Sequence, residues 1–377
     1  MIDSVNSAQS TSSLTSTPYP LWSGGELPKT ADISVLDGVE FSVIQPYQPE
    51  VDGGNWVLGV ALAWHKNRLY ASYGFNRDPH ENTATEQAHC RISDDAGKTW
   101  GDVVVIDDPE GNLGVSHGVF LSRADKLWAF QGAFYDNFQR THTRAYLLDD
   151  ATGSWQPQGV VVGDGFWPMQ EPLKMADGNW IMTGARISNG YDGVEGDLPA
   201  VAISHGDDLT KWDLVVIQPQ AGLGRIWGES TVFIDGPRIF NIARWGAQAR
   251  ALVSISDDCG RSWTEAMPSN LNMNTSKPYT GTLSTGEQYL IGATAADCVN
   301  QRNVLTIALT RPGEAGFSRV FVIRHGVFPQ GPGPSHPKAS LSYPYAIERD
   351  GKLYVGYADK KEPTAELSII PLTALAN

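Results

Sequence analysis

Two pairs of oppositely charged residues share one spacing in this chain. Glu171 and Arg186 are separated by the same interval as Glu229 and Arg244. An Asp-Gly dipeptide between apolar runs lies inside both intervals, and this pattern predicts a β-hairpin with a tight turn. A hairpin brings its two ends together, so we expect each carboxylate beside its guanidinium. A carboxylate can transfer protons, and a guanidinium can bind a ligand carboxylate at two points.

The strand–turn–strand unit that holds these pairs recurs along the chain. It can be traced through residues 59–73, 117–134, 171–186, 229–244, 279–293 and 343–357. Each unit is followed by further strands, so that four strands recur about every fifty to sixty residues. This repeat predicts an all-β fold, a single β-propeller with six four-stranded antiparallel blades. A seventh blade in a poorly matching repeat stays open.

The last repeat lacks a fourth strand. It ends at residues 365–370, whereas residues 39–44 near the N-terminus form a spare strand of the right type. We expect the two segments to pair and close the ring, because an unpaired sheet edge is a liability. Residues 1–20 are rich in Ser and Thr and are expected to form a tail, with residues 21–377 forming the propeller.

A second motif marks the turns between outer strands. Its two full copies are Ser93-Asp94-Asp95-Ala96-Gly97-Lys98-Thr99-Trp100 and Ser256-Asp257-Asp258-Cys259-Gly260-Arg261-Ser262-Trp263. Ser and Asp side chains can bond the local backbone, which predicts a self-contained turn in preference to a metal site. The motif resembles the Asp-box (BNR repeat) of the sialidase-like β-propellers. The Glu–Arg hairpins and Ser342-Tyr343-Pro344 resemble the inner strands of the same superfamily, over about residues 39–370.

Composition excludes several classes of partner. The net charge of −14 argues against nucleic acid, and no apolar run of about 18 residues is present to span a membrane. Three cysteines allow at most one disulfide, and we expect buried free thiols at Cys90 and Cys298. We expect an extracellular monomer that acts on an acidic oligo- or polysaccharide. No cofactor is predicted, and an assisting or structural divalent cation stays open.

The hairpin geometry sorts candidate residues by face. Inner strands begin, and second strands end, on one face, where propeller sites collect around the axis. The catalytic candidates there are His117, His80, Tyr343 and Arg244. The substrate-binding candidates are Arg77, Glu171, Arg186, Arg225, Glu229, Lys277, Tyr279, His336 and Trp167, with Arg140, His142 and Tyr345 in the same wider set. His65 and His205 lie on turns of the opposite face and are expected to be structural.

Each candidate also has a purely structural interpretation. The two Glu–Arg pairs could only hold the ends of their blades, since buried ion pairs fix geometry without catalysing. His80 could cap the turn in which it lies, and Tyr343 could be core packing. His117 starts an inner strand between two glycines, and small neighbours leave room for a ligand.

The resemblance implies two kinds of enzyme. Sialidases use three arginines, an Asp acid/base and a Tyr–Glu nucleophile pair, with the first arginine in a Phe/Tyr-Arg-Ile-Pro motif. This chain has no arginine before Arg68, and its corresponding stretch reads Phe41-Ser42-Val43-Ile44-Gln45-Pro46. In that respect it is more similar to rhamnose–glucuronate lyases and ulvan lyases, in which histidine and arginine replace the carboxylate pair.

The sequence therefore predicts a lyase that cuts by β-elimination next to a glucuronate. Arg186 and Arg244 would neutralise the uronate carboxylate, His117 and His80 would transfer protons, and Tyr343 would assist. Two alternatives stay open. One is an exo-glycosidase of the sialidase or rhamnosidase type, and the other is a glycan-binding propeller without catalysis.

Overall fold

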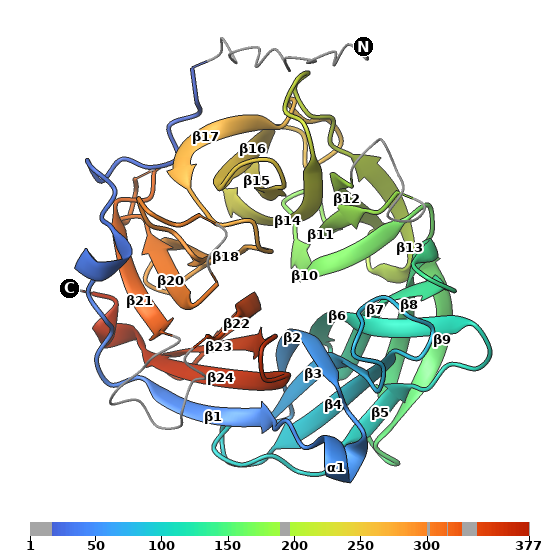
Figure 1. Ribbon diagram of the computed structural model, residues 1–377. Coiled ribbons are helices and arrows are strands. Elements are labelled where there is room, and N and C mark those ends of the chain that lie inside the picture. The colour runs from blue at the N-terminus through green and yellow to red at the C-terminus, as the bar shows by residue number, and fades with distance from the viewer. Residues whose placement is uncertain (1–16, 189–196, 300–301, 315, 326–337, 377) are drawn as a thin grey trace, which may run out of the picture.

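The blades form a closed ring. The structure is a computed structural model that describes residues 17–188, 197–299, 302–314, 316–325 and 338–376. This part of the chain forms six four-stranded antiparallel sheets arranged around a central axis (Figure 1). The prediction of an all-β propeller with six blades is confirmed, and the seventh blade that stayed open is absent from the described residues.

The strands follow the chain in order, from the axis outwards in each blade. Blade 1 holds β2 (Trp56–His65), β3 (Arg68–Asn76), β4 (Gln87–Ser93) and β5 (Val104–Asp107). Blade 2 holds β6 (Leu113–Arg123), β7 (Lys126–Tyr135), β8 (Gln139–Asp149) and β9 (Ser154–Val162). Blade 3 holds β10 (Phe166–Lys174), β11 (Trp180–Arg186), β12 (Leu198–His205) and β13 (Asp208–Val216).

The second half of the ring has the same layout. Blade 4 holds β14 (Ile226–Asp235), β15 (Arg238–Trp245), β16 (Arg250–Ser256) and β17 (Met267–Asn272). Blade 5 holds β18 (Tyr279–Thr282), β19 (Gln288–Gly292), β20 (Val304–Leu309) and β21 (Arg319–His325). Blade 6 holds β22 (Leu341–Arg349), β23 (Lys352–Asp359), β24 (Thr364–Pro371) and the N-terminal β1 (Glu40–Gln45).

Strand β1 closes the ring as the sequence predicts. It pairs antiparallel with β24, with Phe41 opposite Ser368 (Figure 1). An ion pair of 2.6 Å between Lys352 Nζ and Glu40 Oε1 adds a contact to the next strand. An N-terminal strand and three C-terminal strands thus complete one four-stranded sheet. Strand β24 is therefore not left as an unpaired sheet edge.

The segment before β1 runs along the outside of the ring. Isolated bridges join Tyr19 to Ser269 in blade 4 and Trp22 to Phe317 beside blade 5. Of the predicted tail, residues 1–16 lie outside the described part of the chain. The short helices are η1 (Thr30–Asp32), α1 (Pro49–Asp52) and η2 (Leu372–Ala374).

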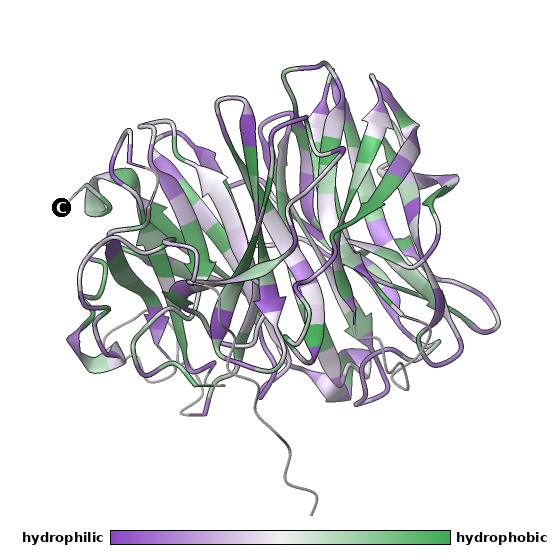
Figure 2. Ribbon diagram, turned by 90° about the horizontal axis from the view of Figure 1, so that it is seen from above, coloured by the Kyte–Doolittle hydropathy of each residue, from purple (hydrophilic) through white to green (hydrophobic). Residues whose placement is uncertain are grey.

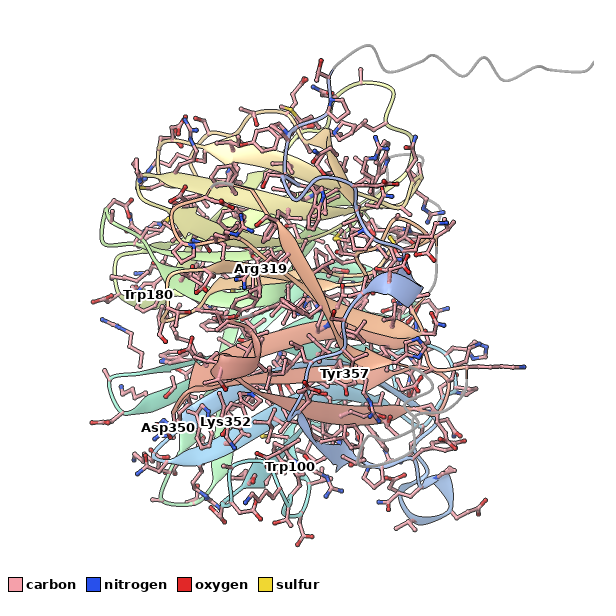
Figure 3. All side chains as sticks on the ribbon, turned by 90° about the vertical axis from the view of Figure 1, so that its left-hand side faces the viewer. Trp100, Trp180, Arg319, Asp350, Lys352 and Tyr357 are labelled. Atoms are coloured by element: carbon pink, nitrogen blue, oxygen red, sulfur yellow. The ribbon has the colours of Figure 1, made fainter. Side chains whose placement is uncertain are left out.

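The turns lie on one side of the disc, where the sequence places them. Lys66 and Asn67 between β2 and β3 both have positive φ, as a two-residue hairpin turn of type I′ requires. Figure 3, which views the disc edge-on, places Trp180, Asp350 and Lys352 near such turns towards the same side. The Asp-boxes close on themselves, because Ser93 Oγ accepts the Gly97 amide at 2.8 Å and Asp95 accepts the Thr99 amide at 2.8 Å.

The core lies between neighbouring blades. Figure 2 shows hydrophobic residues along the strands and hydrophilic residues in the loops of both faces. Cys90 and Cys298 are buried free thiols, as expected, and Cys259 is also free. Within the described residues, no helix combines the length and apolar character needed to cross a bilayer.

Candidate functional site

A cavity of about 200 Å³ opens at the axis, on the face where the inner strands begin. Five of the residues predicted to form the site line it, from four different inner strands and the end of β15: His117, Trp167, Glu229, Arg244 and Tyr343. The rest of its wall is formed by Trp56, Leu58, Glu81, Asn82, Phe138, Met169, Ile187, Asp197 and Trp227. We call this cavity the axial pocket.

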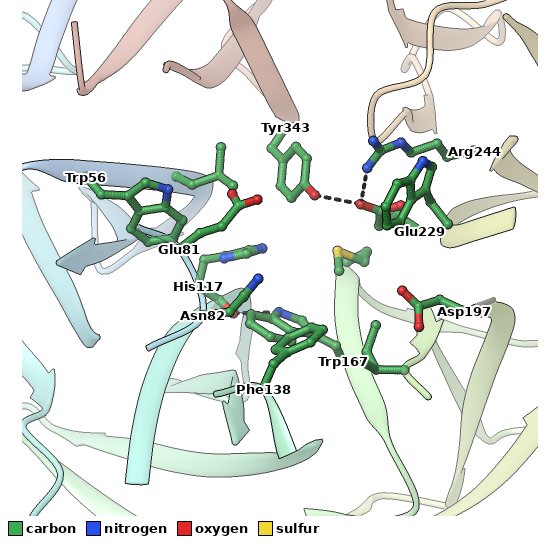
Figure 4. Close-up of a pocket in the computed structure, with 14 residues that line it drawn as sticks. Trp56, Glu81, Asn82, His117, Phe138, Trp167, Asp197, Glu229, Arg244 and Tyr343 are labelled. Atoms are coloured by element: carbon green, nitrogen blue, oxygen red, sulfur yellow. Dashed lines mark hydrogen bonds and ion pairs between the residues drawn. The ribbon is translucent and has the colours of Figure 1, made fainter. Parts of the chain in front are cut away.

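A hydrogen-bonded cluster of three side chains forms one wall of the axial pocket (Figure 4). The Tyr343 hydroxyl donates to Glu229 Oε1 at 2.6 Å, and Arg244 Nη1 donates to the same oxygen at 2.5 Å. Glu229 Oε2 and Arg244 Nε are buried and have no hydrogen-bond partner among the described residues. The cluster therefore keeps one acceptor and one donor that no described protein group satisfies.

The pair Glu229–Arg244 forms because the turn between its strands is short. Asp235 pairs with Arg238 across a two-residue turn, and the register then runs unbroken to Ser230 opposite Ala243. The next residues on each strand are Glu229 and Arg244, which places their side chains together at the open end of the hairpin. The sequence prediction of a carboxylate beside a guanidinium holds for this pair.

The backbone of Tyr343 is held in an unusual conformation. Its φ is +56°, a value that costs a residue with a side chain about 1–3 kcal/mol. The fully buried Lys277 stabilises the next peptide, because its Nζ donates to the carbonyl oxygen of Pro344 at 2.8 Å. Burial lowers the pKa of Lys277 to about 7. Lys277 thus supports the backbone next to Tyr343 and does not itself line the axial pocket.

The Tyr343 hydroxyl is a neutral donor at rest. Burial raises its pKa well above the usual value, and the negative charge of Glu229 raises it further. A phenol in this state becomes a nucleophile only when a base removes its proton during the reaction. Glu229 lies within the distance that such a transfer needs.

His117 forms the floor of the axial pocket beside Tyr343. The two ring centroids are 5.5 Å apart, and the Trp167 ring lies 4.9 Å away on another side. Gly59, with φ of +71°, makes room for the imidazole, since a Cβ there would lie 2.0 Å from it. Burial lowers the pKa of His117 to about 3, and the Lys277 charge contributes. The imidazole is therefore neutral and a weak base.

Two carboxylates in the axial pocket were missed by the sequence analysis. Glu81 lies across the pocket from Glu229 and Asp197 (Figure 4). Glu81 Oε2 accepts from Lys360 Nζ at 2.8 Å, and the buried Glu86 supports its loop by accepting the Asn82 amide. The sequence analysis placed a candidate, His80, directly before Glu81 in the same loop.

Asp197 occupies a different electrostatic environment. Its Oδ1 accepts the Ser188 amide at 3.0 Å. Burial raises its pKa to about 6, and the negative charge of Glu229 acts in the same direction. Asp197 follows a stretch without any strand signal, so the sequence offered no means of placing it at the axis.

Three predicted residues lie on the correct face but outside the axial pocket. His80 is 81% exposed, and its Nδ1 contacts Asp78 at 2.8 Å, so its loop presents Glu81 and Asn82 instead. Arg77 is exposed and donates to Gln87 at 3.2 Å. Arg225 is exposed, with its guanidinium carbon 3.8 Å from the ring centroid of Trp227. The catalytic role predicted for His80 therefore has no geometric support.

The predicted pair Glu171–Arg186 does not form. Five residues separate Lys174 from its partner Trp180, so the turn is longer than two residues and the register shifts. Arg186 therefore lies opposite Phe166, at the rim of the blade. The prediction was wrong because equal sequence spacing gives different pairing when the turn length and the strand bulges differ.

Glu171 lies deeper, in the central channel. It accepts from the Tyr279 hydroxyl at 2.6 Å, and burial raises its pKa. Tyr279 and Tyr345 are buried beside it, with ring centroids 4.7 Å apart. Neither these residues nor Lys277 line the axial pocket, and Glu171 lines a separate cavity of about 490 Å³. His336 lies outside the described residues.

No metal centre is evident in the described residues. Nowhere in ranges 17–188, 197–299, 302–314, 316–325 and 338–376 do three or more His, Cys, Asp or Glu side chains gather closely enough to hold an ion. The acidic Asp-box residues are instead satisfied locally, as for Asp258, whose carboxylate accepts from the Ser262 amide and hydroxyl.

Two histidines on opposite faces provide a test of the face assignment. His65 is 2% exposed on the turn side, where its ring bridges Ser122 and Asp150 at 3.2 and 3.0 Å. We expect His65→Ala to lower the unfolding free energy by about 1–3 kcal/mol with little change in kcat. His117→Ala should lower kcat, because it removes the ring that packs against Tyr343 and Trp167 in the axial pocket. Thermal denaturation and steady-state kinetics measure both, and equal losses of kcat would contradict the assignment.

Solved structures with the same fold are found at low sequence identity. A protein of unknown function from Dyadobacter fermentans is 14% identical, with a TM-score of 0.66 and coverage of 89% of this chain and 99% of that chain. A Hadza microbial sialidase is 13% identical, with a TM-score of 0.69 and coverage of 89% and 69%. Trypanosoma rangeli sialidase bound to the inhibitor DANA is 13% identical, with a TM-score of 0.68.

The match to Trypanosoma rangeli sialidase covers a larger share of this chain than of the sialidase. It takes in 90% of this chain and 61% of the trypanosomal chain, so this chain spans about three fifths of that sialidase. At these identities the likeness shows the fold alone. No curated protein matches the chain.

A family model matches most of the propeller. The model for the BNR repeat-like domain covers residues 90–355, from β4 in blade 1 to β23 in blade 6. The two full Asp-boxes lie within this match. The chain therefore belongs to the BNR repeat-like family, with the architecture of the sialidase-like propellers.

Proposed function

We propose that the protein is a glycoside hydrolase that removes a terminal sugar from an acidic glycan. The observation that carries the proposal is the bond from Tyr343 to Glu229, with Arg244 on the same carboxylate oxygen. This is the tyrosine–glutamate pair that the resemblance to sialidases implies, and sialidases differ from most glycosidases in using a tyrosine as the nucleophile. In the predicted lyase, histidine and arginine would replace this pair.

The reaction can be written from the residues of the axial pocket. Tyr343 Oη attacks the anomeric carbon while its proton passes to Glu229, and the glycosidic bond breaks. Glu81, across the pocket, protonates the leaving oxygen. In the second step Glu81 takes a proton from a water molecule, whose oxygen attacks the anomeric carbon. The bond from that carbon to Tyr343 Oη breaks, the sugar is released, and Glu229 returns the proton to Tyr343.

Arg244 has a positioning role in this scheme. Its Nη1 holds the Glu229 carboxylate that accepts the phenol proton. Trp227 and Trp167 contribute to the apolar wall of the pocket. The volume of about 200 Å³ is small beside the ~300–1,000 Å³ of drug-sized pockets, which favours one sugar ring and hence exo action.

The acidic character of the glycan is supported by the arginines of this face. The chain carries a net charge of −14, yet Arg244 lines the axial pocket. Arg140 and Arg186 line a second cavity, which shares Ile187 with the axial pocket. Guanidinium groups recognise carboxylates by two parallel hydrogen bonds. An acidic oligo- or polysaccharide is therefore the proposed substrate.

The lyase remains a second candidate because of one observation. His117 lies beside Tyr343, and its Nε2 has no hydrogen-bond partner among the described residues. A proton at C5 of a uronate could be removed by such a pair. Its lowered pKa of about 3 makes His117 a weak base, however, which favours the hydrolase.

One assay separates the candidates. Incubation with a panel of acidic oligosaccharides should release reducing sugar without the ultraviolet absorbance of an unsaturated uronate. Release of a product with that absorbance would show the lyase instead. Binding without either product, measured by calorimetry on the same panel, would leave a glycan-binding propeller.

Asp197 predicts a pH dependence of the hydrolase. Its pKa is raised to about 6, so it is neutral below that pH and a carboxylate above it. The new charge near Glu229 strengthens that base, and kcat should rise about three- to tenfold as pH increases through 6. Asp197→Asn should remove this rise. A variant whose kcat–pH profile keeps the rise would show that another group titrates.

A further inference from the structure

A second cavity adjoins the axial pocket between blades 2 and 3. Its volume is about 420 Å³, and Ile187 lines both cavities, so they lie next to each other on one face. The start of β8, the loop before β10 and the end of β11 form its wall, through Arg140, Thr141, His142, Asp164, Arg186 and Ile187. We call it the side cavity.

Several polar groups of the side cavity have no partner in the protein. Thr141 and His142 are 4% and 7% exposed, and Thr141 Oγ1 and His142 Nε2 make no hydrogen bond to any described residue. The half-buried Arg186 guanidinium likewise makes no ion pair or hydrogen bond with the part of the chain that the structure describes. Buried polar groups are nearly always paired, so their meeting in one cavity points to a ligand.

The hydrogen-bonding character of His142 follows from its other nitrogen. Nδ1 lies 2.9 Å from the carbonyl oxygen of Arg140, which can only accept, so Nδ1 carries the proton. Burial lowers the pKa of His142, which keeps the ring neutral. Nε2 is then an acceptor, suited to a ligand hydroxyl.

The charges of the two cavities differ. The axial pocket has three carboxylates, Glu81, Asp197 and Glu229, against the single guanidinium of Arg244. The side cavity has two guanidinium groups against one carboxylate, that of the exposed Asp164. A ligand carboxylate is therefore better placed in the side cavity than at the axis.

We propose that the side cavity is a subsite for a carboxylated sugar, the one that neighbours the sugar cleaved at Tyr343. Arg186 binds the carboxylate, with Arg140 at the rim beside it. His142 Nε2 and Asp164 accept hydroxyl groups, and Thr141 can donate or accept. The position next to the cleaved sugar rests on the proposed function, whereas the binding of a uronate does not.

Binding to the full chain tests the subsite directly. The probes are a disaccharide with a glucuronate at its reducing end and the same disaccharide with the carboxyl group reduced to an alcohol. In a Tyr343→Phe background, which prevents turnover in the proposed mechanism, calorimetry should show tighter binding of the acidic probe. Arg186→Gln should weaken that binding about tenfold or more and leave the reduced probe unaffected.

Two further variants keep the test specific. Arg311→Gln is the control, since Arg311 is an exposed arginine that lines neither cavity; it should bind both probes unchanged. His142→Phe keeps an aromatic ring but removes the acceptor, and should weaken both probes about three- to tenfold.

The outcomes for the subsite and for the hydrolase are distinguishable. Equal binding of both probes by the Tyr343→Phe chain, or equal losses in Arg186→Gln and Arg311→Gln, would overturn the subsite. Absence of hydrolysis by the wild-type chain would overturn the proposed function but would not change the conclusion drawn from the binding measurements. Free D-glucuronate, titrated alone, should lose affinity in Arg186→Gln in either case.

Discussion

Replacing Tyr343 by phenylalanine is expected to lower kcat by at least about a thousandfold, with KM changed only a few-fold. The substitution removes the oxygen that attacks the anomeric carbon and leaves the ring in place against His117. Glu229 keeps its bond to Arg244, so the axial pocket should retain its shape. Steady-state kinetics and circular dichroism on the purified variant measure both expectations.

A covalent trap makes the role of Tyr343 specific. A fluorinated substrate analogue should leave a sugar attached to Tyr343 of the wild-type chain, which peptide mass spectrometry can locate. The control is Tyr354→Phe, a buried tyrosine of β23 whose ring packs on Trp64 with centroids 5.4 Å apart, away from the pocket. Full activity of Tyr343→Phe, or an adduct on a different residue, would contradict the nucleophile.

Glu229→Gln should have the next largest effect, and it acts on stability as well as activity. Glutamine cannot accept the phenol proton, so kcat should fall by about 10²- to 10⁴-fold. It also leaves the buried Arg244 without a counter-charge, and breaking a buried pair costs about 3–5 kcal/mol. Chemical denaturation should therefore show a lower unfolding free energy than for the wild type.

A double-mutant cycle separates the two effects. Arg244→Met alone leaves Glu229 unpaired, whereas Glu229→Gln with Arg244→Met removes both charges. The double variant should lose less unfolding free energy than the sum of the single losses, because neighbouring residues are coupled. Its kcat should stay as low as that of Glu229→Gln. Additive stability losses would show that the pair is not coupled, and a recovered kcat would show that Glu229 is not the base.

The architecture followed from signals that act over short distances. Hairpins, Asp-boxes and the four-strand repeat depend on residues within about one blade, so their count predicts six blades. The missing fourth strand of the last repeat predicts that β1 pairs with β24, and the register of Phe41 opposite Ser368 agrees. The pair Glu229–Arg244 was predictable for the same reason, because a two-residue turn fixes its register.

The same reasoning failed where a loop or a turn departed from the repeat. The sequence placed Arg186 beside Glu171, yet the longer turn before Trp180 moved it to the side cavity. The sequence analysis also selected His80, whereas the structure places Glu81 of the same loop in the axial pocket. Which residue of an irregular loop faces the axis depends on its packing, here on Glu86 buried beneath it, and pattern alone does not give that.

By itself, then, the amino-acid sequence determined the ring, its closing strand and the face on which the inner strands begin, since these follow from local periodicity. Only the tertiary structure decided which side chains meet at the axis. Tyr343, Glu229 and Glu81 come from blades 6, 4 and 1, and Lys277 reaches Pro344 from the start of blade 5. These contacts join residues far apart in the chain, so they arise only when the blades close around one axis.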